Sequence, residues 1–87
     1  MIKEGFVLRK MPGMNLVMPT GANVKTFKGA LMLNDTGAFV FAELVEKKSI
    51  DEVAEKLTEE YAVSIEKAKD DVIKTINSLI EAGVWAE

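Results

Sequence analysis

The sequence predicts one α+β domain with a winged-helix-like arrangement, in which a three-stranded antiparallel sheet is followed by three helices. The chain has 87 residues, the length of a single small domain, and we assign all of it to that domain. Its first part carries short apolar runs separated by proline and glycine turn signals. Its remainder carries apolar residues at helical spacing. Strands followed in a block by helices are typical of α+β folds.

The predicted sheet consists of three short segments. Residues 6–11 form the first strand, and Pro12-Gly13 fits the centre of a type II turn, because proline presets the first φ and glycine accepts the positive one. Residues 15–18 complete the hairpin, and residues 28–33 form the third strand. The end of that strand, Gly29–Leu33, is apolar at almost every position, which predicts a strand covered on both faces. Such cover is unexpected for so small a sheet unless something packs on its second face or edge.

The three predicted helices begin at recognisable capping residues. Asn34 is the expected N-cap of the first helix, and Ser49 with Glu52 forms a capping box for the second. Ser64 caps the third helix, and Gly83 occupies the position of a C-cap glycine. The predicted helices span residues 35–46, 50–61 and 65–82.

The composition argues against catalysis and metal binding. The absence of cysteine rules out disulfides, thiolate zinc sites and cysteine-held iron–sulfur clusters. The absence of histidine removes the commonest general base and metal ligand. Adjacent acidic residues such as Asp70-Asp71 diverge around a helix and do not share a site. We therefore predict no enzyme activity, no catalytic residues, no metal and no cofactor.

Charge is divided unevenly along the chain. Residues 1–34 carry five basic side chains against one acidic one, whereas residues 35–87 carry six lysines against thirteen acids. The simpler explanation of this uneven distribution is that the charges lie on ordinary solvated faces. The functional explanation is that a basic sheet edge attracts an acidic partner segment. The charged N-terminus lacks a signal-peptide core, and no apolar run reaches the roughly 20 residues of a membrane span. We expect a cytoplasmic protein without a membrane partner.

Three functions remain open from these patterns. A winged-helix outline suits a DNA-binding regulator, but the exposed residues of the third helix are mixed in sign, and phosphate binding needs net positive charge. A structural or dimerisation domain is the second possibility. Peptide capture is the third, because an open edge on Gly29–Leu33 would accept an extended peptide as a fourth strand. Methionines, which suit adaptable surfaces, gather in the strand region at positions 11, 14, 18 and 32.

Several segments carry a family likeness: Phe6-Val7-Leu8-Arg9, Pro19-Thr20-Gly21, and Leu33-Asn34-Asp35-Thr36-Gly37-Ala38. Over nearly its whole length the chain resembles the pyrroloquinoline quinone biosynthesis protein D (PqqD) family. More broadly, it resembles the leader-peptide recognition domains of ribosomal peptide (RiPP) modification. One departure is Glu46-Lys47-Lys48, where relatives often carry Asp-Gly before the second helix.

The resemblance implies a non-catalytic peptide chaperone. Such a protein binds the leader of a ribosomally made precursor peptide and presents the peptide to a modifying enzyme, often a radical S-adenosylmethionine enzyme. It further implies that the leader adds as a strand beside the third strand and packs against the third helix. We also expect a monomer or weak dimer that binds no nucleic acid. Mapped onto this chain, the expected peptide-binding residues are Gly29, Ala30, Leu31, Met32 and Leu33 of the strand, with Lys69, Ile73 and Ile76 of the helix.

Overall fold

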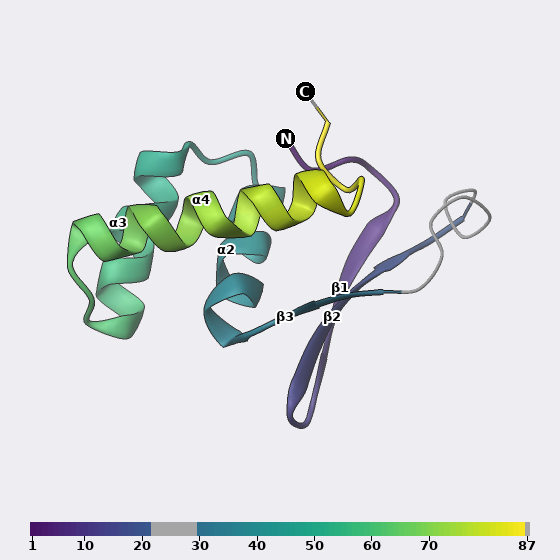
Figure 1. Ribbon diagram of the computed structural model, residues 1–87, viewed down its shortest axis with the longest axis horizontal. Helices are drawn as coiled ribbons and strands as arrows, with labels where there is room; N and C mark the ends of the chain where they lie inside the picture. Colours follow the sequence, from purple (N-terminus) through teal and green to yellow (C-terminus); the bar gives the residue numbers. More distant parts are fainter. Residues whose placement is uncertain (22–29, 87) are drawn as a thin grey trace.

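A computed structural model of the chain describes residues 1–21 and 30–86. Figure 1 shows a small twisted sheet packed beside three helices, which confirms the predicted α+β class and the order of the elements. The strands and helices, in chain order, are β1 (Phe6–Met11), β2 (Met14–Pro19), β3 (Leu31–Leu33), α2 (Asp35–Val45), α3 (Ile50–Tyr61) and α4 (Ile65–Glu81).

The sheet is antiparallel, with the strand order β1-β2-β3. Met11 pairs with Met14, so the hairpin loop is Pro12-Gly13 alone, and Gly13 has the positive φ of +80° that this turn requires of its glycine. β2 is one residue longer at each end than predicted. In the third strand, predicted residues 28 and 29 lie outside the described part of the chain, and Ala30 precedes the ladder.

Capping defines the helix starts as predicted. The Asn34 side chain accepts a hydrogen bond from the Gly37 backbone N–H at 2.7 Å, and Ser49 and Glu52 form the reciprocal capping box. The Ser64 side chain accepts from a backbone N–H of the first turn of α4. α2 and α4 each end one residue earlier than predicted, because Glu46 and Ala82 act as their C-caps.

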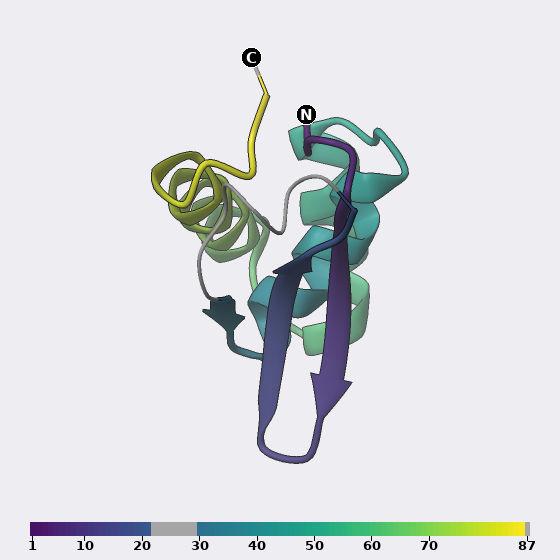
Figure 2. The same cartoon turned by 90° about the vertical axis from the view of Figure 1, so that its right-hand side faces the viewer.

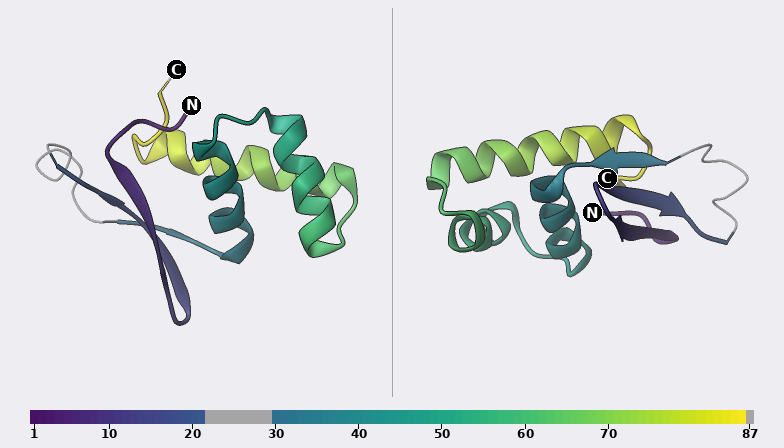
Figure 3. Two further views of the ribbon diagram at one scale, coloured as in Figure 1. Left: turned by 180° about the vertical axis from the view of Figure 1, so that it is seen from behind. Right: turned by 90° about the horizontal axis from the view of Figure 1, so that it is seen from below.

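The core lies between one face of the sheet and the helices. Val17 and Leu33 from the sheet pack with apolar side chains of all three helices, and Phe41 and Leu79 are among the largest fully buried side chains. Figure 3 shows α4 running along the domain and over β3. The chain ends meet through a bridge between Ile2 and Trp85, so the first residues are tied to the last.

The prediction that the third strand is covered on both faces is wrong for its central residue. Leu33 is buried against the helices, whereas the side chain of Met32 is 65% exposed. Successive side chains of a strand point to opposite faces, and here the helices lie on one face only. Figure 2 looks onto the sheet, with the hairpin in front of the helices.

No helix in the described ranges combines the length and apolarity needed to cross a bilayer.

Candidate functional site

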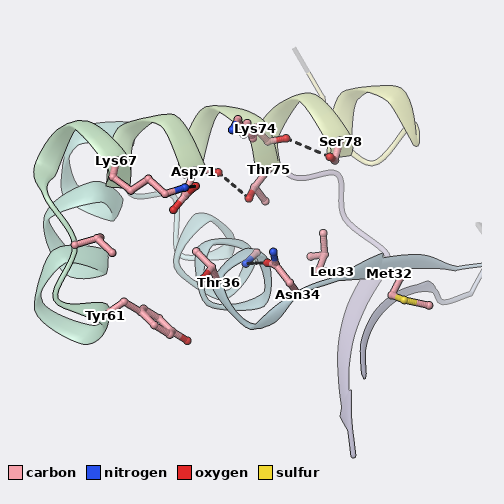
Figure 4. Close-up of a pocket in the computed structure, with 12 residues that line it drawn as sticks. Met32, Leu33, Asn34, Thr36, Tyr61, Lys67, Asp71, Lys74, Thr75 and Ser78 are labelled. Carbon is pink, nitrogen blue, oxygen red and sulfur yellow. Dashed lines mark hydrogen bonds and ion pairs between the residues drawn. The ribbon is translucent and has the colours of Figure 1, made fainter. Parts of the chain in front are cut away.

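A groove separates the β3–α2 corner from α4. It encloses a cavity of about 470 Å³. Figure 4 shows Met32, Leu33 and Asn34 on one side of this groove and the side chains of α4 on the other. Tyr61, at the end of α3, lies beside the groove, and its ring packs edge-on against Phe39 with centroids 5.8 Å apart. We call this cavity and its walls the β3–α4 groove.

The helical wall of the β3–α4 groove is polar. Five residues at three- and four-residue spacings share one side of α4, which are Lys67, Asp71, Lys74, Thr75 and Ser78. The Lys67 ammonium lies 2.7 Å from the Asp71 carboxylate, and this hydrogen bond and charge raise the pKa of Lys67 above its ordinary value. The Thr75 and Ser78 hydroxyls donate to backbone carbonyls of α4 at 2.9 and 3.2 Å. Because all these partners lie within the helix, the wall is preformed.

The opposite wall contains the edge of β3. β2 pairs with one edge of β3, and no strand in the described part of the chain pairs with the other. Backbone N–H and C=O groups alternate between the two edges of a strand, so β3 presents unpaired groups along its outer edge. The side chains of this strand, Leu31–Leu33, are all uncharged. β1, the other edge strand, carries Arg9 and Lys10, and charges of this kind protect an edge from pairing.

A hydrogen-bonded corner holds β3 in place. The amide of Asn15, which is 7% exposed, donates to the Leu33 carbonyl at 3.2 Å and to the Asp35 carboxylate at 3.0 Å. Gly37 permits the tight approach of α2, because a Cβ there would lie 3.1 Å from the Asn34 side-chain oxygen and 3.3 Å from Leu33 Cβ. The strand end and the helix start are therefore fixed relative to each other.

The predicted strand residues lie at this site where they can be placed. Met32 and Leu33 line the β3–α4 groove, and Leu31 belongs to the strand that forms its edge. Ala30 immediately precedes that strand and is exposed. Gly29 lies outside the described residues.

The three predicted helix residues do not line the cavity of the β3–α4 groove, and their part in peptide binding stays a prediction. Lys69 turns toward α3, where its ammonium lies 3.4 Å from the Asp51 carboxylate. Ile76 belongs to the core and is 8% exposed, and Ile73 is 48% exposed on another side of α4. One residue advances an α-helix by about 100°, so Ile73 lies about 160° around α4 from Asp71.

Sequence reasoning chose one border of the apolar stripe of α4, at Lys69, Ile73 and Ile76, and so did not name the helix residues that line this groove. The stripe through Val72 and Leu79 identifies the buried side of α4, but this stripe has two borders. In the structure, the border of the stripe that carries polar side chains lies beside β3. The sequence feature that marks this wall is the polar stripe through Lys67, Asp71 and Ser78. The stripe indicates a binding surface only when β3 is known to lie beside it.

This arrangement suits an extended polypeptide. A preformed wall, an uncharged strand edge and a groove between them provide backbone hydrogen bonds and side-chain contacts together. Within residues 1–21 and 30–86, no three histidine, cysteine, aspartate or glutamate side chains are placed to hold a metal ion.

Comparison with known proteins identifies the family and the fold of the chain. A family model described as coenzyme PQQ synthesis protein D (PqqD) matches residues 16–84. A solved structure titled "TbiB1 in Complex with the TbiA(beta) Leader Peptide" superposes with a TM-score of 0.76 at 17% sequence identity, covering 99% of this chain and 98% of that one. At this identity the likeness establishes the shared fold. No curated protein matches the sequence significantly.

Proposed function

The chain belongs to the PqqD family, and from this premise we propose that it is a non-catalytic module that binds the leader of a ribosomally made precursor peptide. The observation that carries the proposal is the uncharged edge of β3, which faces α4 across the groove and pairs with no strand among the described residues. TbiB1, which has the same fold, is in complex with a leader peptide in its solved structure.

The leader binds by strand addition. Its backbone pairs with the outer edge of β3, and alternate side chains point toward the groove and away from it. Side chains that enter the groove contact Leu33 and Tyr61 and meet the polar wall of α4. Main-chain hydrogen bonds provide affinity, and the groove provides selection among sequences.

The bound leader holds the rest of the precursor for a modifying enzyme, and the family resemblance implies a radical S-adenosylmethionine enzyme for that role. In this proposal the chain contributes binding rather than chemistry to that step; it has neither cysteine nor histidine. We place the protein in the cytoplasm, where precursor peptides are synthesised.

The charges on α4 do not favour the DNA-binding alternative. Lys67 is paired with Asp71, and Lys74 lies 3.0 Å from Asp70, so neighbouring carboxylates oppose the phosphate attraction of both lysines. No second function is proposed.

An amide NMR titration with a leader peptide tests the proposal. We expect the largest shifts at Leu31–Leu33 and along the groove side of α4. Ser78→Trp fills the groove and should weaken binding at least tenfold. Asn77→Trp is the matched control, because Asn77 is exposed on α4 but does not line the groove, and it should bind like the unchanged chain.

Two results would contradict this proposal. One is saturable leader binding that leaves the β3 amides unshifted, which would exclude strand addition. The other is equal leader affinity of Ser78→Trp and the unchanged chain, which would place the peptide outside the groove. Circular dichroism of both tryptophan variants verifies that α4 is intact.

A further inference from the structure

The face of the sheet that points away from the helices is apolar. Paired residues of adjacent strands share a face, so the register places Val7 with Met18, Arg9 with Leu16, and Leu16 with Met32. Met11 and Met14 share the same face at the hairpin end. We call this surface the outer sheet face; its apolar members are Val7, Met11, Met14, Leu16, Met18 and Met32.

The outer sheet face holds four of the five methionines of the chain. Val7 is 43% exposed, Met11 45% and Met32 65%. The helices lie behind the sheet when it is viewed from this side (Figure 2). A contiguous exposed apolar surface marks an interaction site more often than scattered single residues do, and methionine adapts to varied partner shapes.

A second cavity of about 450 Å³ lies where the outer sheet face meets the β3–α2 corner. Met14 and Met32 line it together with Asn15 and Asp35. Met32 also lines the β3–α4 groove, so the two cavities adjoin across β3. A protein seated on the outer sheet face therefore lies next to a peptide bound at the strand edge.

We propose that the outer sheet face is the docking surface for the enzyme that modifies the bound precursor peptide. This inference rests on the proposed leader-binding function and adds the place where the enzyme binds. The enzyme presents an apolar patch, one side chain of which enters the cavity between Met14 and Met32, with a carboxylate positioned for Arg9.

The charge on the outer sheet face favours the modifying enzyme over a second copy of the chain as the protein that binds there. Arg9 is the one charged residue of the outer sheet face in the described strands, and it forms no ion pair within the described residues. A two-fold dimer through this face would place the Arg9 side chains of both copies in one interface, and the described strands offer no acidic residue on that face to pair with them. An acidic, apolar partner meets both features of the surface, and a guanidinium with a carboxylate is a favourable interface pair.

Charge reversal on β1 tests this proposal with a matched control. Arg9→Glu changes the outer sheet face, whereas Lys10→Glu makes the same change in charge on the opposite face of the same strand. The purified modifying enzyme and a labelled leader peptide are the two probes. We expect Arg9→Glu to weaken enzyme binding at least tenfold, Lys10→Glu to leave it within twofold, and both variants to bind the leader normally.

Methionine oxidation provides a second test on the unchanged chain. Mild peroxide treatment followed by mass spectrometry reports the accessibility of each thioether. The enzyme should protect Met11, Met14 and Met18, the leader alone should protect Met32, and Met1 serves as the reference, since it is 54% exposed and does not lie on this face.

The outcomes separate this inference from the proposed function. Normal enzyme binding by Arg9→Glu, or unprotected Met11 and Met18 in the enzyme complex, overturns the docking surface while leader binding stands. A dimer in sedimentation that Arg9→Glu alters would assign the face to a second copy and also overturn it. Failure of the unchanged chain to bind any leader refutes the proposed function itself.

Discussion

Asn15 offers the sharpest test of how the groove is held. Its buried amide joins the end of β3 to the start of α2 through the Leu33 carbonyl and the Asp35 carboxylate. Asn15→Ala removes both bonds. Removal of one partner leaves the buried Leu33 carbonyl without this hydrogen bond, and an unsatisfied buried acceptor costs about 1–3 kcal/mol. The bond to Asp35 adds little, because that residue is exposed.

The expected loss from Asn15→Ala is therefore about 2 kcal/mol of unfolding free energy. For a domain of this size, that loss lowers Tm by roughly 8–16 °C. Urea unfolding followed by circular dichroism measures the free energy, and a leader titration measures the effect on the groove. We expect leader affinity to fall as well, because the outer edge of β3 loses the anchor that fixes its position.

Asn15→Asp sharpens the test, because it keeps the side-chain shape while its carboxylate can only accept hydrogen bonds at neutral pH. It faces the Leu33 carbonyl and the Asp35 carboxylate, so it should be less stable than Asn15→Ala. Asn77→Ala, at an exposed helical position, is the control and should change stability little. A loss below about 0.5 kcal/mol for Asn15→Ala, within the range of ordinary surface substitutions, would refute the role given to this corner.

Three further predictions concern the helices. Ala62 has a φ of +51°, so Ala62→Gly should stabilise the fold by up to about 1 kcal/mol. The same change at Ala42, which is exposed within α2, should destabilise the fold by about 1 kcal/mol. Equal effects of the two substitutions in urea unfolding would contradict this prediction. Ile73→Asp should leave leader affinity unchanged in a titration, and a large loss would show that the peptide crosses that side of α4. The backbone N–H of Ser49, and then its side chain, lower the pKa of Glu52, so this stabilisation is complete above the ordinary pKa of 4.5 and is lost as the pH falls through the lower folded value. The unfolding free energies of Glu52→Gln and the unchanged chain should therefore converge on acidification, and a constant gap would oppose this assignment.

Local interactions explain how much of the fold was readable from the sequence. Asn34, Ser49 and Ser64 each act through a backbone N–H three residues away, so their capping role is visible in a short window. Pro12-Gly13 similarly determines its own turn. Lys47 shows the limit of local rules, because it has a φ of +63°, a conformation that favours glycine and that a lysine does not signal.

The candidate site was only half predictable. The apolar run at the end of the third strand led to the hypothesis that an extended peptide adds to its edge, and the structure places Met32 and Leu33 at the groove. The outer sheet face was not foreseen, although its methionines were noted, because alternation assigns a side chain to a face only when the register of pairing is known. The exposure of Met32 follows from that register.

The sequence by itself determined the α+β class, the order of the elements, the caps and the absence of cysteine and histidine chemistry. These properties depend on composition and on contacts between residues close along the chain. Only the tertiary structure decided which side of α4 faces β3, because burial of Val72 and Leu79 sets the rotation of the helix and leaves Asp71 and Ser78 toward the strand. The groove is formed by elements that meet across the core, and their relative placement is not encoded in either segment alone.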